Sequence, residues 1–312
     1  MFKKLLICSD LSDASNALIN CVGQLKNAGV EEALLLHVVY ETIPFETEEV
    51  QLERLKPIID ENHPTSQAIL DKLENQRSIL DAAGIKTVIK TVHGIPSQVI
   101  TEEAEKQKAS AIFMGTHGKG ILKRATIGSV SSEVLTMTRI PVFLVKTTIS
   151  KDEVTLACKR MFNRILYLTD FSKTAVRALD YVEKLVGDLK VPVTILHVQD
   201  TVDIDGLIHS VPELDPKVIK DIQDRNTKAV ENDLVSIKTK LEAAGAANVD
   251  YQLAKGRPID VIMKTIEDNK DLSLVVMGSQ GKGFVKELFM GSLSLQVTRY
   301  SPIPVLLIPA KS

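Results

Sequence analysis

Two stretches of the sequence carry glycine and serine at the same spacing. The first is "MGTHGKGILKRATIGSVSSEV" at 114–134, and the second is "MGSQGKGFVKELFMGSLSLQV" at 277–297. In each, Gly-x-x-Gly is followed after nine residues by Gly-Ser, which gives Gly115, Gly118, Gly128 and Ser129, and again Gly278, Gly281, Gly291 and Ser292. Because glycine lets a backbone approach a ligand closely, the spacing predicts a loop that holds phosphate groups. The Gly-Lys-Ser/Thr ending of a P-loop and the glycine triplet of a dinucleotide-binding turn are both absent.

The residues around these glycines suit an anionic ligand. Gly115 and Gly118 can take positive φ and let the backbone approach a ligand closely. A helix that opens at Gly128 and Ser129 offers free N–H groups and its dipole to an anion, with the Ser129 hydroxyl as a further donor. Cationic side chains occupy the same loops, namely Lys119, Lys123 and Arg124 in the first and Lys282 and Lys286 in the second.

An aspartate follows a short apolar run in two places. "LLICS" leads to Asp10, and "ILYLT" leads to Asp170. An apolar run of this length predicts a strand buried on both faces that stops at a loop. A carboxylate there can accept a hydrogen bond from a ribose hydroxyl or an adenine amino group. Helix capping is the alternative role, because Ser12 and Ser172 stand where they would cap the following helices.

These pairs belong to a repeat that spans the chain. Four further matches extend it beyond the aspartates, pairing His37 with His197, Pro96 with Pro258, Gly115 with Gly278 and Pro141 with Pro304. A nearly constant offset means two copies of one domain. We therefore predict a first domain at 1–147, a linker at 148–162 and a second domain at 163–312.

Each copy alternates strand and helix patterns. The predicted strands of the first copy are "LLICS", "ALLLHVV", "KTVIKTV", "ASAIFMG" and "PVFLV", and those of the second are "ILYLT", "VTILHVQ", "VDYQLAK", "LSLVVMG" and "PVLLI". Helical periodicity runs through 14–25 and 175–186, and long surface helices are expected at roughly 47–83 and 214–244. Further helices start near Ser129 and Ser292. This alternation predicts an α/β fold, a parallel sheet with helices on both faces.

The predicted sheet brings the candidate residues to one edge. Ligands of such sheets bind beyond the carboxyl ends of the strands, where the strand order reverses. Asp10 follows strand one, Val38 lies near the end of strand two, and Gly115 ends strand four. We expect all three to line one crevice.

Composition and charge exclude several classes of protein. The chain has 312 residues and a net charge of −2, so no charge-driven contact with nucleic acid or an anionic membrane is expected. The apolar run at the N-terminus ends at Asp10, too short for a signal peptide, and no stretch approaches the ~20 apolar residues of a membrane span. Cys8, Cys21 and Cys158 are widely spaced and are expected to be reduced thiols. We expect a cytoplasmic protein.

The doubled glycine motif, the aspartate after strand one and the "LHV" strand together resemble the universal stress protein family in its tandem two-domain form. The resemblance covers nearly the whole chain. It implies two Rossmann-like domains of the adenine nucleotide alpha hydrolase-like type, each with a five-stranded sheet of order 3-2-1-4-5. It further implies binding of ATP, ADP or AMP, with Mg²⁺ held by the phosphates, and a homodimer of tandem chains.

In that family the aspartate and the strand-two valine contact adenine and ribose, and the glycine loop with its serine holds the phosphates. The implied nucleotide-binding residues are Asp10, Val38, Met114, Gly115, His117, Gly118, Lys119, Gly128, Ser129 and Val130 in the first copy, and Asp170, Val198, Met277, Gly278, Gln280, Gly281, Lys282, Gly291, Ser292 and Leu293 in the second. The copies differ where Thr116, His117 and Val130 become Ser279, Gln280 and Leu293. The two affinities are therefore expected to differ.

Simpler interpretations stand beside these. The glycines could be turn residues, although two copies at identical spacing argue against it. His37 and His197 lie within apolar strands, and we favour structural over catalytic roles. Gln280 replaces His117 in the second copy, which argues against an essential acid or base there. Histidine and cysteine show no zinc spacing, so we predict no metal ligand.

Residues 115–129 lack the carboxylate and the orienting residue that phosphoryl transfer requires. We predict no catalytic residue and at most slow ATP hydrolysis. The leading hypothesis is a nucleotide-binding stress-response or signalling module whose nucleotide alters a surface that an unidentified protein partner contacts. An ATP-using enzyme such as an adenylating enzyme is one alternative, and a scaffold that holds AMP or no nucleotide is another.

Overall fold

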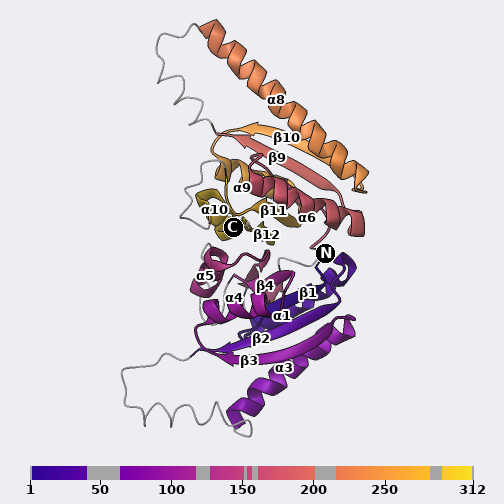
Figure 1. The fold of residues 1–312 in the computed structure, drawn as a ribbon, viewed down its shortest axis with the longest axis vertical. Coiled ribbons are helices and arrows are strands. Elements are labelled where there is room, and N and C mark those ends of the chain that lie inside the picture. Colours follow the sequence, from indigo (N-terminus) through magenta and orange to yellow (C-terminus); the bar gives the residue numbers. More distant parts are fainter. Residues whose placement is uncertain are drawn as a thin grey trace, which may run out of the picture. The chain divides into compact units, whose positions relative to one another are not determined.

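The computed structural model describes residues 2–40, 64–116, 127–150, 153–156, 161–200, 216–281 and 290–310. The chain divides into two compact units, Met1–Lys159 and Arg160–Ser312 (Figure 1). Strands and helices alternate along each unit, as the repeat predicts.

The first unit contains a parallel five-stranded sheet. Its elements are β1 (Lys4–Cys8), α1 (Asp13–Val22), a 3-10 helix (Gly23–Ala28), β2 (Glu32–Val39), α3 (Pro64–Ala82), β3 (Lys86–His93), α4 (Pro96–Lys106), β4 (Ala111–Gly115), α5 (Ser129–Met137) and β5 (Val142–Val145). The strand order is β5-β4-β1-β2-β3. In the central strand, Leu6 pairs with Leu34 of β2 and Ile112 of β4.

The second unit repeats this plan. Its elements are β8 (Ile165–Leu168), α6 (Lys173–Leu189), β9 (Val193–Gln199), α8 (Pro216–Ala243), β10 (Val249–Lys255), α9 (Pro258–Asp268), β11 (Leu274–Gly278), α10 (Ser292–Tyr300) and β12 (Val305–Ile308). The order β10-β9-β8-β11-β12 corresponds to 3-2-1-4-5, as it does in the first unit. The predicted fold class and strand order are confirmed.

The residues 148–162, which we expect to form the linker, include further strands. β6 (Thr147–Ser150) pairs antiparallel with β7 (Glu153–Leu156), and this hairpin packs against α1. The boundaries of the linker stay a prediction.

Buried strands and paired helices build each core. Leu5, Leu6 and Ile7 of β1 are fully buried, which explains the uninterrupted apolar run. The sheet is wound outward from its centre in two directions, and right-handed crossovers therefore place helices on opposite faces. Accordingly α1 packs with α3 and α4 with α5, while α6 packs with α8 and α9 with α10. Figure 1 shows α3 along β3 and α8 along β10.

The helix ends follow local sequence signals. Ser12 and Ser172 accept hydrogen bonds from Ser15 N and Ala175 N at 3.2 and 3.3 Å, so the predicted caps are confirmed. The helical pattern predicted for 14–25 changes to 3-10 geometry at Gly23, where glycine weakens the α-helix. α8 nearly fills the predicted span 214–244, whereas the part of 47–83 that precedes α3 lies outside the described residues.

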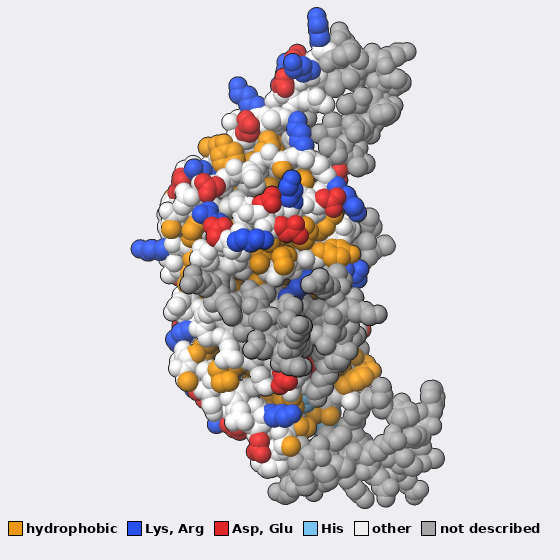
Figure 2. Space-filling view, turned by 180° about the vertical axis from the view of Figure 1, so that it is seen from behind, with side chains coloured by type: hydrophobic (Ala, Val, Ile, Leu, Met, Phe, Trp, Pro, Cys, Tyr) orange, Lys and Arg blue, Asp and Glu red, His pale blue; other side chains and the backbone are white. Residues whose placement is uncertain are grey.

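Among the described residues, no helix has both the length and the apolar character that crossing a bilayer requires. Figure 2 shows one face of the molecule, on which acidic and basic side chains of the described residues are intermixed. Among the described residues visible on that face, neither sign of charge forms a large patch.

One expectation about the cysteines is wrong. Cys8 is a free thiol, whereas Cys21 of α1 is disulfide-bonded. Cys158 lies outside the described residues. Sequence spacing could not reveal the bond, because a disulfide depends on the folded distance between two Cβ atoms.

Burial raises the pKa of the Cys8 thiol well above its usual range. Because the thiolate is the reactive form, we expect Cys8 to resist iodoacetamide at pH 8 in the folded protein and to react after unfolding in guanidinium chloride. Peptide mass spectrometry after timed labelling measures both rates. Alkylation of native Cys8 as fast as that of the unfolded chain would contradict this expectation.

Candidate functional site

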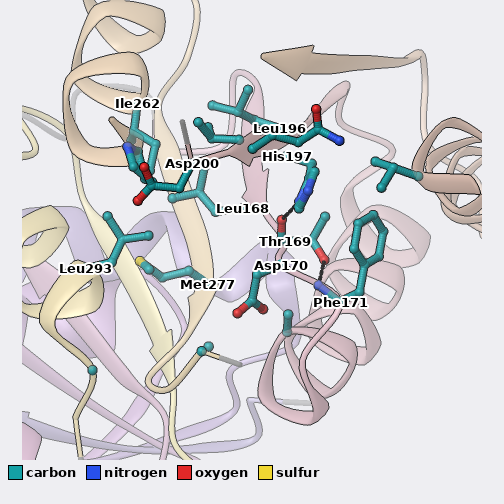
Figure 3. Close-up of a pocket in the computed structure, with 18 of the residues that line it drawn as sticks. Leu168, Thr169, Asp170, Phe171, Leu196, His197, Asp200, Ile262, Met277 and Leu293 are labelled. Carbon is teal, nitrogen blue, oxygen red and sulfur yellow. Dashed lines mark hydrogen bonds between the residues drawn. The ribbon is translucent and has the colours of Figure 1, made fainter. Parts of the chain in front are cut away.

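The second unit brings its predicted residues together around one cavity of about 890 Å³ (Figure 3). The lining includes all the predicted residues that are described, namely Asp170, Val198, Met277, Gly278, Gln280, Gly281, Gly291, Ser292 and Leu293. Lys282 lies outside the described residues. The residues converge because β8, β9 and β11 are parallel and end at the same edge, where the strand order reverses.

A strained turn carries Asp170 out of β8. Phe171 adopts left-handed backbone geometry with φ of 60°, which is uncommon for a bulky residue and costs about 1–3 kcal/mol. Two hydrogen bonds from the backbone hold the turn: Phe171 N donates to Thr169 Oγ1 at 3.1 Å, and Ser172 N donates to Asp170 Oδ1 at 3.0 Å. The turn thereby fixes the direction of the carboxylate, which Figure 3 shows beside the strand ends.

His197 supports the same turn from β9. Its Nδ1 lies 2.7 Å from Thr169 O, and because a carbonyl only accepts, Nδ1 carries the hydrogen. The ring is 8% exposed and packs against the Phe171 ring at a centroid distance of 4.7 Å. This geometry supports the structural role that we favour for the histidine, which also lines the cavity.

The first unit contains an equivalent turn. Leu11 has φ of 62° and donates its N–H to Ser9 Oγ at 3.2 Å. His37 Nδ1 lies 2.8 Å from Ser9 O. The two units thus have the same left-handed backbone geometry at this edge, although their side chains differ.

The environment of Asp10 differs from that of Asp170. Asp10 Oδ1 accepts hydrogen bonds from Ser12 N, Ser12 Oγ and Ser15 Oγ at 3.1, 2.6 and 2.5 Å. Ala175 replaces Ser15 in the second unit and has no hydroxyl to offer. Asp10 therefore binds the first residues of α1. The alternative role of helix capping, which the sequence left open for this aspartate, is thus part of its role.

The backbone around the glycine stretch is the same in both units. Gly128 N donates to Thr116 O, and Gly291 N donates to Ser279 O, each at 2.7 Å. Ser131 Oγ donates to Gly115 O at 2.8 Å, and Ser294 Oγ donates to Gly278 O at 3.0 Å. These bonds join the start of each following helix to the end of the preceding strand. Ser131 and Ser294 were not predicted, although the repeated "GSVS" and "GSLS" hold the signal.

The helices behind the loops start without a side-chain cap. Gly128 and Gly291 occupy the N-cap positions, with φ of −61° and −75°. Because glycine has no side chain, the first turns of α5 and α10 receive no hydrogen bond from an N-cap side chain. The N–H groups at these positions therefore suit an anion.

Two glycines lie where another part of the chain approaches closely, rather than where φ is positive. A Cβ at Gly278 would lie 2.6 Å from Thr174 Oγ1 and 2.8 Å from Thr174 C, and one at Gly281 would lie 2.8 Å from Asp170 Oδ2. Gly115, which could take positive φ, is not among the described glycines that do so. The described glycines with positive φ are Gly29, Gly84, Gly94, Gly245 and Gly256. Gly118 lies outside the described residues.

The other predicted residues of the first unit lie at the matching edge of its sheet. Val38 is near the end of β2, Met114 and Gly115 end β4, and Ser129 and Val130 begin α5. His117 and Lys119 lie outside the described residues.

The fold also adds residues that the sequence did not single out. Asp170 of the turn after β8 lies against Gly281 of the glycine stretch. α9 contributes Pro258 and Ile262, and the chain after β9 and the end of β10 contribute Asp200 and Lys255. Along α8, lining residues recur at helical spacing, namely Gln223, Asn226, Thr227, Ala229, Val230 and Asp233. Among the described residues, no three His, Cys, Asp or Glu side chains are grouped to hold a metal ion.

The contact at Gly278 makes a stability prediction. We expect Gly278→Ala to lower the free energy of unfolding of the second unit by about 1–3 kcal/mol, because the new methyl overlaps Thr174 of α6. Ser279→Ala is the neighbouring control. Its Oγ is buried with no hydrogen-bond partner among the described residues, so stability should be unchanged or slightly higher. Urea unfolding followed by circular dichroism measures both, and equal midpoints would contradict the overlap.

Comparison with known proteins identifies the family. The sequence model described as "Universal stress protein family" matches residues 1–146 and again residues 161–309. The chain belongs to the universal stress protein family. The double match means that this universal stress protein is a tandem form, as the repeat predicts.

Single-domain relatives match about half of this universal stress protein. One from Methanocaldococcus jannaschii is 32% identical over 156 residues, covering 47% of this chain and 96% of the relative. Another from Bacillus subtilis is 28% identical over 153 residues, covering 47% and 99%. A solved universal stress protein from Archaeoglobus fulgidus covers 98% of both chains, with a TM-score of 0.68 and 26% identity.

Proposed function

We propose that this protein binds adenine nucleotides, ATP among them, at one site in each domain. The observation that carries the proposal is the convergence of the predicted residues of the second domain on one cavity. Their chemistry fits a nucleotide, because uncapped helix amides suit phosphate and a carboxylate at the strand edge suits ribose. The glycine at position 281 also fits a bound ligand, because a Cβ there would fill the space beside Asp170.

In the proposed arrangement, Gly281, Gly291 and the hydroxyl of Ser292 hold the phosphates at the start of α10. Asp170 accepts a hydrogen bond from the ribose, and Val198 contacts the adenine. Mg²⁺, held by the phosphates, would neutralise part of their charge.

The first domain is proposed to hold a second nucleotide. Support comes from the shared backbone geometry, namely the left-handed turns at Leu11 and Phe171 and the loop-closing bonds of Gly128 and Gly291. The additional hydrogen bonds on Asp10 lead us to expect unequal affinities.

We propose that the bound nucleotide serves a stress-response or signalling role in the cytoplasm, in a homodimer of tandem chains, with a protein partner that distinguishes the loaded from the empty state. A ligand shifts such an equilibrium only by its differential affinity for the two states. The charge of the phosphates is the natural source of that difference.

Separate titrations of the full chain with ATP, ADP and AMP test this proposal. A module that senses the phosphate chain should bind ATP at least several-fold more tightly than AMP. Equal affinities would favour the scaffold alternative, and binding of none of the three would overturn the proposal.

A further inference from the structure

The cavity of the second domain has two sides, and the proposed nucleotide residues use only one. Figure 3 shows Ile262, Met277 and Leu293 on one side and His197 and Phe171 on the other, with Leu168 and Thr169 between them. The second side continues onto α8, which lies on the face of the sheet opposite α9 and α10. We call Phe171, His197, Gln223, Asn226, Thr227 and Asp233 the α8 wall.

The cavity has room for more than the nucleotide. Its volume of about 890 Å³ lies near the upper end of the roughly 300–1,000 Å³ that small-molecule pockets usually enclose. The proposed phosphate contacts lie at the start of α10, away from the helix that carries the wall. A second small ligand can therefore occupy the α8 wall while the nucleotide is bound.

The chemistry of the α8 wall favours a cation. Gln223 and Asn226 offer amide oxygens, Thr227 offers a hydroxyl, and Asp233 offers a carboxylate, all of which accept hydrogen bonds. An aromatic ring such as that of Phe171 attracts a cation at its face.

The charged side chains of the described lining also favour a cation. Its carboxylates belong to Asp170, Asp200 and Asp233, against the single ammonium group of Lys255. Of these carboxylates only that of Asp233 belongs to the α8 wall, and Figure 3 shows Asp200 beside Ile262 on the other side. An amine on the wall would be attracted by Asp233 and by the phosphates of a nucleotide.

The first domain differs at the decisive position. Leu73, Gln76 and Leu80 are the buried residues of α3, with the same spacing as Leu234, Ile237 and Leu241 of α8. This register places Lys72 of α3 where α8 has Asp233, which reverses the charge. At this position of the helix, the described residues of the two domains therefore carry opposite charge.

We infer that the α8 wall binds a small organic cation, an amine or guanidinium compound, beside the nucleotide. The binding of the cation stands by itself, and only its coupling to ATP rests on the proposed function. Because the two ligands have opposite charge in one cavity, each should raise the affinity of the protein for the other by the same factor.

Calorimetric titration of the full chain with agmatine, first without nucleotide, tests the inference. We expect one binding site, and an affinity at least tenfold lower in Asp233→Lys. Asp224→Lys is the matched control, because Asp224 is an exposed residue of the same helix that does not line the cavity. Circular dichroism checks that both variants fold.

The outcomes separate this inference from the proposed function. ATP binding without agmatine binding would overturn the inference and leave the function standing. Equal loss of agmatine binding in Asp233→Lys and Asp224→Lys would overturn the location. Agmatine binding without ATP binding would support a cation site at the α8 wall and contradict the nucleotide site. If each ligand raised the affinity of the protein for the other several-fold, both proposals would be supported.

Discussion

Replacing Gly281 with valine is expected to lower the affinity of the second domain for ATP by at least about a hundredfold, or roughly 2.7 kcal/mol. A Cβ at this position would lie 2.8 Å from Asp170 Oδ2, closer than Cβ atoms come to other atoms in proteins, so the carboxylate must shift. The branched side chain must therefore displace the carboxylate or enter the space proposed for the phosphates. Isothermal titration with ATP measures the loss.

Gly118→Val is the counterpart in the first domain, assigned from the repeat because Gly118 lies outside the described residues. Each single variant should bind one ATP per chain where the parent binds two, and the double variant should bind none. Thermal unfolding of each variant checks that the domains remain folded. Unchanged stoichiometry in either variant would show that the phosphate loop is placed wrongly.

Replacing Asp170 with alanine is expected to weaken ATP binding to the second domain by about ten- to a hundredfold. A hydrogen bond to a charged group contributes about 1.5–3 kcal/mol, and Asp170 is the proposed acceptor of the ribose hydroxyl. The parent protein should also discriminate against 2′-deoxy-ATP or 3′-deoxy-ATP, according to which hydroxyl Asp170 binds. Asp170→Ala should bind that analogue and ATP equally well.

The comparison between nucleotides separates binding from folding. Asp170 also accepts a hydrogen bond from Ser172 N at the start of α6, so its loss could loosen the turn and weaken all nucleotides alike. Ser172→Ala is the control, since it removes the neighbouring cap and leaves the carboxylate. If Asp170→Ala retained full discrimination between ATP and both deoxy analogues, Asp170 would not be the ribose acceptor.

The repeat made much of the fold predictable. The short apolar runs that precede Asp10 and Asp170 form buried central strands. Because both copies have the same glycine and aspartate spacings, the repeat indicated that these spacings matter. Ser12 and Ser172 are caps in the structure as in the prediction, because capping depends on residues only three positions apart. Signals of this kind are local, so a sequence contains them directly.

Features that depend on distant packing were missed or mistaken. Gly278 is required because α6 approaches the end of β11, and no sequence neighbour of Gly278 reveals that contact. Polar residues of α8 such as Asn226 and Asp233 are exposed, as expected of a surface helix, but that they also line the cavity could not be predicted. The disulfide bond of Cys21 likewise depends on tertiary structure.

Isothermal titration of the purified full chain with ATP and magnesium, followed by chromatography of the nucleotide over several hours, tests the central proposal most directly. The proposed function predicts two bound nucleotides per chain of unequal affinity, with little ADP formed. The absence of binding heat at any accessible ATP concentration, confirmed by equilibrium dialysis, would contradict it, and rapid formation of ADP would show that the protein is an enzyme instead.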